Sequence, residues 1–179
     1  MDNDDRTIVD RVRAGESEAF AEIVDRYRRP IFNMVLRLVG DYDDAVEVTQ
    51  QAFVAAYEKL ETYDPAYRFF SWLYRIAYNA ALNYIKRGKK TVRLETIMIA
   101  SDSNPEVEFV CGERDDFLHR ALQAVDIDHR VVLILRHFIG FRYEEIMGIL
   151  DITEHTLKFR LHVARWKLRE RLIDLGYFR

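Results

Sequence analysis

Apolar residues recur at every third or fourth position along most of this chain, which is the spacing of one face of an α-helix. The stretch RFFSWLYRIAYNAALNYIKR, residues 68–87, illustrates the pattern. Its predicted core face consists of Phe69, Leu73, Ile76, Ala77, Ala80 and Tyr84. No segment has the strict alternation of apolar and polar residues that is typical of a β-strand. The sequence therefore predicts an all-α fold.

The boundaries of the helices follow from turn and capping residues. Helices are expected over residues 7–14, 16–39, 43–61, 68–87 and 143–150, and from residue 153 onward. Pro30 is expected to kink or split the second helix. Asp43 is expected to cap the third helix, and Gly88 to end the fourth.

Residues 94–113 have weak periodicity, with Ser, Asn, Pro and many acids, and are interpreted as a flexible acidic linker. The chain is thus expected to form two small helical domains, residues 1–93 and 114–179. The longest apolar runs, such as Val131–Leu135, are too short to span a bilayer. The N-terminus, MDNDDRTIVD, lacks the apolar region of a signal peptide. We expect a cytoplasmic protein without direct membrane insertion.

The net charge of −3 hides a strong segregation of charge along the chain. Residues 41–64 hold seven acids and one base, residues 65–94 hold seven bases and no acid, and residues 95–116 hold seven acids and one base. Blocks of this kind indicate separate surfaces for separate partners.

The basic block lies on one edge of the helix at residues 68–87. This edge carries cations, amides and an aromatic ring: Arg68, Trp72, Arg75, Asn79, Asn83 and Lys86. Single-stranded bases are held by aromatic stacking and amide hydrogen bonds, and their phosphates by cations. The edge therefore favours binding of unpaired nucleic acid. A solvated face, with Trp72 as a boundary core residue, is the alternative.

The C-terminal stretch YEEIMGILDITEHTLKFRLHVARWKLRERL has the form of a helix-turn-helix. Residues 143–150 form the first helix, LDI the turn, and Thr153 the cap of the second helix. The buried stripe is predicted at Leu157, Leu161, Ala164, Leu168 and Leu172, with an outward stripe at His155, Phe159, Val163 and Trp166. Lys and Arg flank the buried stripe, so the helix favours DNA binding, and an amphipathic helix with a solvated basic face is the alternative.

No pattern for catalysis or metal binding stands out. The five histidines and Cys111 all lie in the C-terminal part, but no histidine pair has the i, i+4 spacing of a helical zinc site. A nucleophile elbow, a P-loop and paired carboxylates are all absent from the sequence. We expect no enzyme activity, no metal, no cofactor and no small-molecule substrate.

Three motifs occur in order: DDAVEVTQQAFVAAYEKL, FFSWLYRIAYNAALNYIKR and the helix-turn-helix stretch. Together they resemble the bacterial sigma factors of the extracytoplasmic-function (ECF) group of the sigma-70 family. The resemblance implies an alternative sigma factor that binds core RNA polymerase and selects promoters. It implies contacts with the β′ clamp helices and the opened −10 element by the first domain. It implies −35 and β-flap contacts by the second, and an anti-sigma factor that could hold the protein at the membrane.

The resemblance also implies which residues make these contacts. Polymerase binding is expected from Asp44, Glu47, Gln50 and Gln51. Contacts to the −10 element are expected from Tyr63, Tyr67, Arg68, Trp72, Arg75, Asn79, Asn83 and Lys86. Contacts to the −35 element are expected from Thr153, His155, Thr156, Lys158, Phe159, Arg160, His162 and Arg165. The turn has Asp151 where the family usually has glycine, a residue that tolerates left-handed geometry at some cost.

Two other readings remain open at this point. A sigma mimic would bind an anti-sigma factor without binding promoters, and the unusual residues of the recognition helix motivate it. A stand-alone helix-turn-helix regulator would bind DNA without needing the acidic helix at residues 43–61.

Overall fold

The computed structural model describes residues 2–91 and 113–177, and every regular element among them is helical. The elements are α1 (Asp2–Arg13), η1 (Ser17–Ala19), α2 (Phe20–Val39), α3 (Tyr42–Glu58), η2 (Leu60–Thr62), α4 (Phe69–Thr91), α5 (Glu113–Gln123), α6 (Ile127–Leu133), η3 (Ile134–Phe138), α7 (Tyr143–Leu150) and α8 (Glu154–Asp174). The predicted all-α fold is confirmed. The predicted linker lies outside the described residues, except for Glu113, which opens α5.

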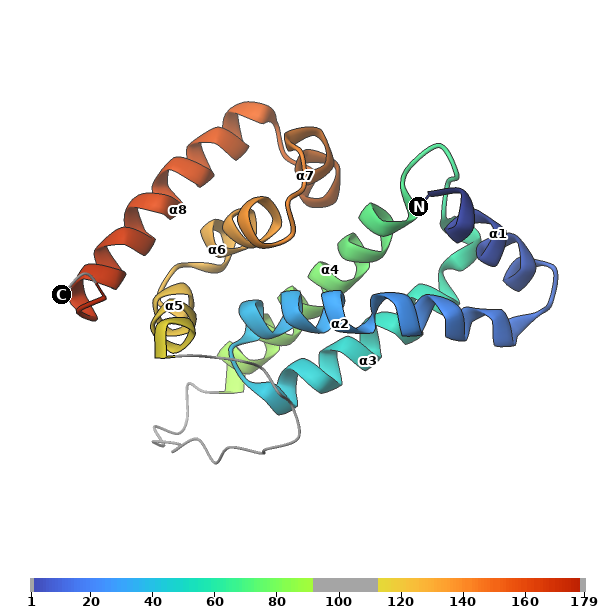
Figure 1. Ribbon diagram of the computed structural model, residues 1–179, viewed down its shortest axis with the longest axis horizontal. Coiled ribbons are helices and arrows are strands. Elements are labelled where there is room, and N and C mark those ends of the chain that lie inside the picture. The colour runs from blue at the N-terminus through green and yellow to red at the C-terminus, as the bar shows by residue number, and fades with distance from the viewer. Residues whose placement is uncertain (1, 92–112, 178–179) are drawn as a thin grey trace.

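The N-terminal unit is built from α2, α3 and α4, which lie side by side, with α1 at one end (Figure 1). Its core is made of fully buried aliphatic side chains such as Ile31, Leu38 and Leu73. The buried face of α3 is mostly small, with alanines at 45, 52 and 56. Small residues let α3 approach both neighbours closely, so the larger side chains of α2 and α4 fill the space between the helices.

Pro30 does not split the second predicted helix, because α2 continues through it from Phe20 to Val39. Buried residues lie on both sides of the proline: Ile23 and Tyr27 precede it, and Ile31 and Met34 follow it. Burial of each such side chain is worth about 1.5–3 kcal/mol, and together these outweigh the hydrogen bond that proline removes. The interruption lies earlier, at the short helix η1.

Three other boundaries differ from the sequence prediction. The cap of α3 is Asp41, whose carboxylate accepts a hydrogen bond from the Asp44 backbone N–H at 3.0 Å. Asp41 can do this because it has extended backbone angles after Gly40, which is left-handed at φ 94°. Gly88 lies inside α4, where glycine costs only about 1 kcal/mol relative to alanine. At the N-terminus, α1 begins at Asp2, before the expected position.

The buried face of α4 is rotated from the predicted one. The buried residues are Phe69, Leu73, Tyr74, Ala77, Tyr78 and Ala81. The predicted core residues Ile76, Ala80 and Tyr84 are only half-buried. The reason is tertiary: α2 and the C-terminal unit cover the side of α4 that carries Tyr74 and Tyr78.

The C-terminal unit consists of α5 to α8, and α7 and α8 form the predicted helix-turn-helix (Figure 1). Asp151 occupies the turn in the left-handed conformation at φ 53°, as the sequence suggested. The Thr153 hydroxyl accepts a hydrogen bond from the Thr156 backbone N–H at 3.3 Å, so the predicted cap is confirmed. The predicted stripe of α8 is buried at Leu157, Leu161 and Ala164, and half-buried at its two later leucines.

The two units pack against each other through one continuous apolar core. Phe141, which precedes α7, is buried with its ring centroid 5.2 Å from those of Phe70 and Tyr74. Arg130 of α6 is buried too, and its guanidinium donates to the carbonyl of Leu38 in α2 at 2.6 Å. This burial lowers the pKa of Arg130 to about 10. The packing of Phe141 on Phe70 and Tyr74 explains why the aromatic side of α4 is covered.

Candidate polymerase and nucleic-acid interfaces

The acid–amide stripe predicted for polymerase binding lies along one face of α3. Glu47, Gln50 and Gln51 are exposed, and Asp44 is half-buried. The Gln51 amide donates to the Glu47 carboxylate at 2.7 Å, one helical turn away. Asp44 accepts a hydrogen bond from the Tyr84 hydroxyl of α4, which raises the pKa of Tyr84 to about 12. Asp44 therefore joins the two helices, while the other three side chains face outward.

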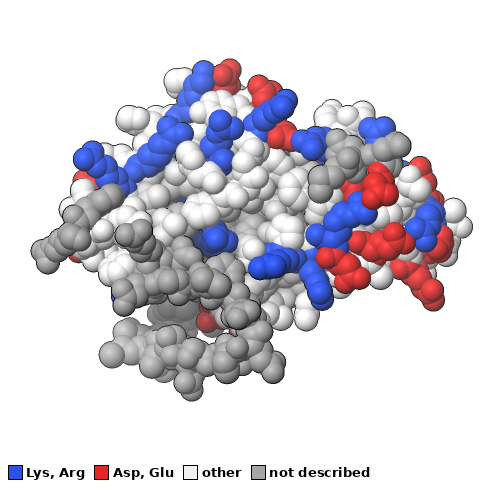
Figure 2. Space-filling model, in the orientation of Figure 1, with Lys and Arg blue, Asp and Glu red and all other residues white. Residues whose placement is uncertain are grey.

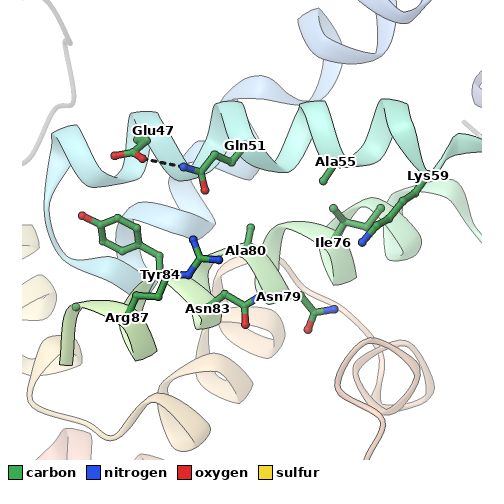
Figure 3. A pocket seen from close by; sticks show the side chains of 11 residues that line it. Glu47, Gln51, Ala55, Lys59, Ile76, Asn79, Ala80, Asn83, Tyr84 and Arg87 are labelled. Atoms are coloured by element: carbon green, nitrogen blue, oxygen red, sulfur yellow. Dashed lines mark hydrogen bonds between the residues drawn. The ribbon is translucent and has the colours of Figure 1, made fainter. Parts of the chain in front are cut away.

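A groove of about 580 Å³ separates this stripe from α4. Glu47, Gln51 and Lys59 line one wall, and Asn79, Asn83 and Arg87 line the other. Figure 3 shows Glu47 and Gln51 of α3 across the groove from Tyr84 and Arg87 of α4. The structure thus brings residues of the predicted polymerase set next to residues of the predicted −10 set.

Most of the predicted basic edge of α4 is solvent-accessible. Arg68, Arg75, Asn79, Asn83 and Lys86 are exposed. Trp72 is only half-buried, and its ring packs 5.5 Å from Tyr63 and 5.4 Å from Phe69. Much of the Trp72 surface is therefore used in an aromatic cluster, and its ring offers less area for stacking than the sequence suggested.

The two tyrosines of the loop before α4, residues 63–68, differ in solvent exposure. Tyr63 is buried at 2% exposure, whereas Tyr67 is 70% exposed. The Tyr63 hydroxyl donates to the Tyr67 carbonyl at 2.8 Å. Asp64 accepts from the Ala66 backbone N–H at 2.9 Å, which forms a tight turn across Pro65. Tyr67 is therefore the aromatic ring of this loop that a partner could reach, and Tyr63 holds the loop from inside.

The second helix of the helix-turn-helix, α8, carries the basic flanks that the sequence predicted. Figure 2 shows Lys and Arg side chains along α8, at the upper left. Several are already paired: Lys158 with Glu154 at 2.7 Å, Arg160 with Asp128 at 3.8 Å, and Arg165 with His137 at 3.4 Å. The hydrogen bond from Lys158 to Glu154 raises the pKa of Lys158, and burial lowers the pKa of His137.

The outward stripe of α8 is exposed except at Val163. Phe159 is 59% exposed and Trp166 is 56% exposed, while Val163 is half-buried. His155 and His162 are exposed as well, and Thr153 and Thr156 form the helix cap. The N-terminal unit packs mainly against α5, α6 and α7. Large exposed apolar side chains in a row indicate a surface that meets another molecule.

Arg13, the last residue of α1, contacts the segment before the loop at residues 63–68, and it is not among the site residues predicted from the sequence. Its guanidinium donates to the backbone carbonyls of Leu60 and Tyr63, at 2.8 and 2.7 Å. The contacted residues lie about fifty positions away in sequence, and an arginine at a helix end carries no local signal of such a contact. Among the described residues, no group of three His, Cys, Asp or Glu side chains could hold a metal ion, and no helix is long and apolar enough to cross a membrane.

Comparison with known proteins agrees with these features. The family model of sigma-70 region 2 matches residues 23–91. The ECF RNA polymerase sigma factor SigW of Bacillus subtilis (strain 168) is 30% identical, over 93% of this chain and 96% of its own length. The ECF RNA polymerase sigma-E factor of Escherichia coli (strain K12) is 32% identical, over 90% of each chain.

Solved structures show the same fold. The sigma factor RpoE, in complex with the anti-sigma factor NepR from Bartonella quintana, aligns with a TM-score of 0.71 and 24% identity, over 86% of this chain and 96% of that one. CnrH, in complex with the cytosolic domain of CnrY, aligns with a TM-score of 0.70 and 24% identity, over 96% and 97%.

Fold and sequence together define a two-unit helical protein with a sigma-70 region 2 and a C-terminal helix-turn-helix. The chain belongs to the ECF RNA polymerase sigma factors. The resemblance seen in its motifs is confirmed. Members of this family regulate transcription and are not enzymes.

Proposed function

We propose that this alternative sigma factor binds core RNA polymerase through α3, the opened −10 element through α4 and the loop at residues 63–68, and the −35 element through α8. The division into domains 1–93 and 114–179 belongs to the same proposal. The observation that carries it is the groove in which Glu47 and Gln51 lie opposite Asn79 and Asn83. In this arrangement, a polymerase docked on α3 would lie beside the basic edge of α4, and promoter DNA bound to the polymerase could reach that edge.

The polymerase contact uses the exposed carboxylate and amides of Glu47, Gln50 and Gln51. A coiled-coil partner such as the β′ clamp helices offers cationic and polar side chains, and charge-assisted hydrogen bonds to such groups give both affinity and register. Asp44 supports this surface indirectly, because its carboxylate is already bound to Tyr84.

The −10 contact uses the exposed cations and amides of α4 together with Tyr67. Cations neutralise phosphates, amides read base edges, and an exposed aromatic ring stacks on an unpaired base. Since Tyr67 is the most exposed ring of the loop, we assign base stacking to it. Tyr63 and Trp72 then act by supporting the loop from the aromatic cluster below it.

The −35 contact uses the first turns of α8, as in other helix-turn-helix proteins whose second helix enters the major groove. Lys158, Arg160, His162 and Arg165 would approach phosphates. Thr153 caps α8, and His155, Thr156 and Phe159 lie in its first two turns. The Phe159 ring suits a thymine methyl group. The C-terminal unit would also meet the β flap.

The proposal is tested by reconstituting the full chain with core polymerase and genomic DNA and mapping transcript starts. Discrete starts that require the added chain support it. If the chain binds core polymerase but gives no new starts, the promoter contacts are wrong. If it binds neither core polymerase nor DNA, the whole assignment fails.

A sigma mimic is the second candidate, and the uncovered stripe at Phe159 and Trp166 favours it. An apolar stripe in place of polar base-reading groups suits a protein partner better than DNA. One solved structure with this fold is a complex of the sigma factor RpoE with the anti-sigma factor NepR, and we propose an anti-sigma factor as a partner of this chain too. Absence of promoter-specific starts, together with tight binding to an anti-sigma factor, would select the mimic.

A further inference from the structure

Helix α1 is attached to the loop at residues 63–68 by the side chain of its last residue, Arg13. One guanidinium nitrogen, Nη2, donates to the backbone carbonyls of Leu60, Glu61 and Tyr63, at 2.8, 3.3 and 2.7 Å. These carbonyls lie where η2 ends, where the last carbonyls of a helix commonly lack a partner within the helix. The Leu60 carbonyl also accepts from the Tyr63 backbone N–H at 3.1 Å. Arg13 therefore completes the hydrogen bonding of the segment that leads into the loop.

The attachment continues from Tyr63 to the tip of the loop. The Tyr63 ring is buried beside Phe69, with centroids 5.2 Å apart, and the Arg13 guanidinium lies 5.9 Å from the Tyr63 centroid. From this fixed position, the Tyr63 hydroxyl donates to the carbonyl of Tyr67. The Tyr67 backbone N–H in turn donates to the Asp64 carbonyl at 3.1 Å. The backbone of Tyr67 is thus held at both its N–H and its C=O, while its ring projects into solvent.

A second cation of α1, Arg6, contacts the carbonyl of Pro65 in the same loop. By contrast, Arg11 of α1 pairs with the carboxylates of Glu16 and Glu22, at 2.8 and 2.7 Å. The guanidinium of Arg13 is therefore used differently from that of its neighbour: its close hydrogen bonds go to loop backbone, and its ion pair with Glu61 is long, at 3.8 Å.

We infer that Arg13 is a positioning residue for the −10 element: it fixes the backbone of residues 60–63, so that Tyr63 holds Tyr67 ready to stack on an unpaired base. The inference rests on the −10 role proposed for the loop. A recognition loop that is rigid before binding loses less conformational freedom when it binds, and it discriminates better between bases. Without Arg13, three backbone carbonyls lose this donor, and the loop can adopt other conformations.

The test compares Arg13→Ala with Arg11→Ala, a matched control that removes a guanidinium of the same helix without touching the loop. Each full-length variant is assembled with core polymerase and titrated with two labelled single-stranded oligonucleotides. One carries the −10 sequence of a promoter mapped with wild-type protein, and the other carries a substituted base at the position most sensitive to substitution. Fluorescence anisotropy gives the ratio of the two affinities. Core-polymerase affinity and thermal stability are measured in parallel.

We expect Arg13→Ala to reduce this preference about tenfold, within the range of one lost base stack, with core affinity unchanged. Arg11→Ala keeps the wild-type preference, even if its stability falls equally. If both variants keep the wild-type preference, Arg13 is only structural and the inference is wrong. If Arg13→Ala does not fold, Arg13→Met is judged by the same criterion, since methionine keeps the apolar length of the side chain but donates no hydrogen bond. If wild-type holoenzyme itself shows no preference, the proposed −10 function fails instead.

Discussion

The carboxylate of Glu145 in α7 accepts a hydrogen bond from the Arg68 guanidinium at 2.7 Å. This ion pair joins the C-terminal unit to the residue that begins the basic edge of α4. Glu145 is 16% exposed and Arg68 is 53% exposed, so the acid is the more deeply held partner. The Glu145 carboxylate therefore pairs with Arg68, a cation that we assign to binding of a promoter phosphate.

We expect Glu145→Gln to strengthen binding of a single-stranded −10 oligonucleotide by the free protein. The amide oxygen of glutamine can still accept from the Arg142 backbone N–H, which Glu145 caps at 2.8 Å, so the helix start is retained. Exposed ion pairs are worth about 0.2–1 kcal/mol, which predicts a gain of up to about fivefold. Anisotropy of a labelled oligonucleotide measures it. Glu144→Gln, a neighbouring exposed acid, is the control, and an equal gain there would mean that only net charge matters.

The packing of the two units also limits what the protein can reach. Positions −10 and −35 are about 25 base pairs apart, or about 85 Å along B-DNA at about 3.4 Å per base pair. Thr153, at the start of the recognition helix, follows Glu145 by eight residues. A chain of that length spans at most about 29 Å. With Glu145 bound to Arg68, the two proposed DNA-binding surfaces are therefore too close together to engage both elements of one promoter.

We therefore expect the units to separate when core polymerase and promoter are bound. Dyes placed by Asp25→Cys in α2 and Arg169→Cys in α8, with Cys111→Ser, report the separation by energy transfer. Transfer is expected to be high in the free protein and to fall on assembly. A dye pair within the C-terminal unit, Glu144→Cys with Arg169→Cys, is expected to stay constant. Unchanged transfer in the first pair at saturating polymerase and promoter would contradict the separation.

Reversing the charge of Glu47 is expected to weaken core-polymerase binding by about tenfold or more, because a lysine there would face the cationic groups that the carboxylate attracts. Glu47→Lys also breaks the hydrogen bond with Gln51. The measurement is a titration of labelled variant with core polymerase. Asp25→Lys makes the same charge change on α2, away from the stripe, and serves as the control. Equal affinities for both variants would show that α3 does not bind through this side chain.

Two aromatic substitutions are expected to separate binding of DNA from stability. Tyr67→Ala removes an exposed ring and should change the free energy of unfolding by less than about 0.5 kcal/mol, yet reduce promoter opening. Trp72→Ala removes a ring packed on Tyr63 and Phe69, and should cost about 3 kcal/mol of stability. Thermal melts give the stabilities, and permanganate reactivity of −10 thymines, at equal polymerase occupancy, gives the opening.

A template melted in advance around −10 is expected to rescue Tyr67→Ala in part, if the ring acts mainly in opening. Asn79→Ala should behave like Tyr67→Ala, since its amide is exposed on the same edge and has no part in the core. Wild-type permanganate reactivity in both variants would show that this edge is only a solvated surface.

Local features of the fold were predictable because they depend on residues close together in sequence. The helical spacing of apolar side chains predicts the all-α fold, and Thr153 caps α8 through a hydroxyl only three residues from its partner. Asp151 adopts the left-handed turn through its own backbone preference. The residue types of the three proposed binding surfaces are likewise present in the sequence, and so is the family resemblance that the order of the motifs carries.

Tertiary structure alone decided which faces of these helices are covered. Periodicity gives the width of an apolar face but does not say which neighbour packs on it. The buried face of α4 therefore differs from the predicted one, because Phe141 of the C-terminal unit packs on Tyr74. The same holds for Tyr63, which is buried rather than presented to a base. The contacts of Arg13 with Tyr63 and of Arg68 with Glu145 join residues 50 and 77 positions apart. Such pairings are set by the packing of whole helices, and local sequence carries no signal of them.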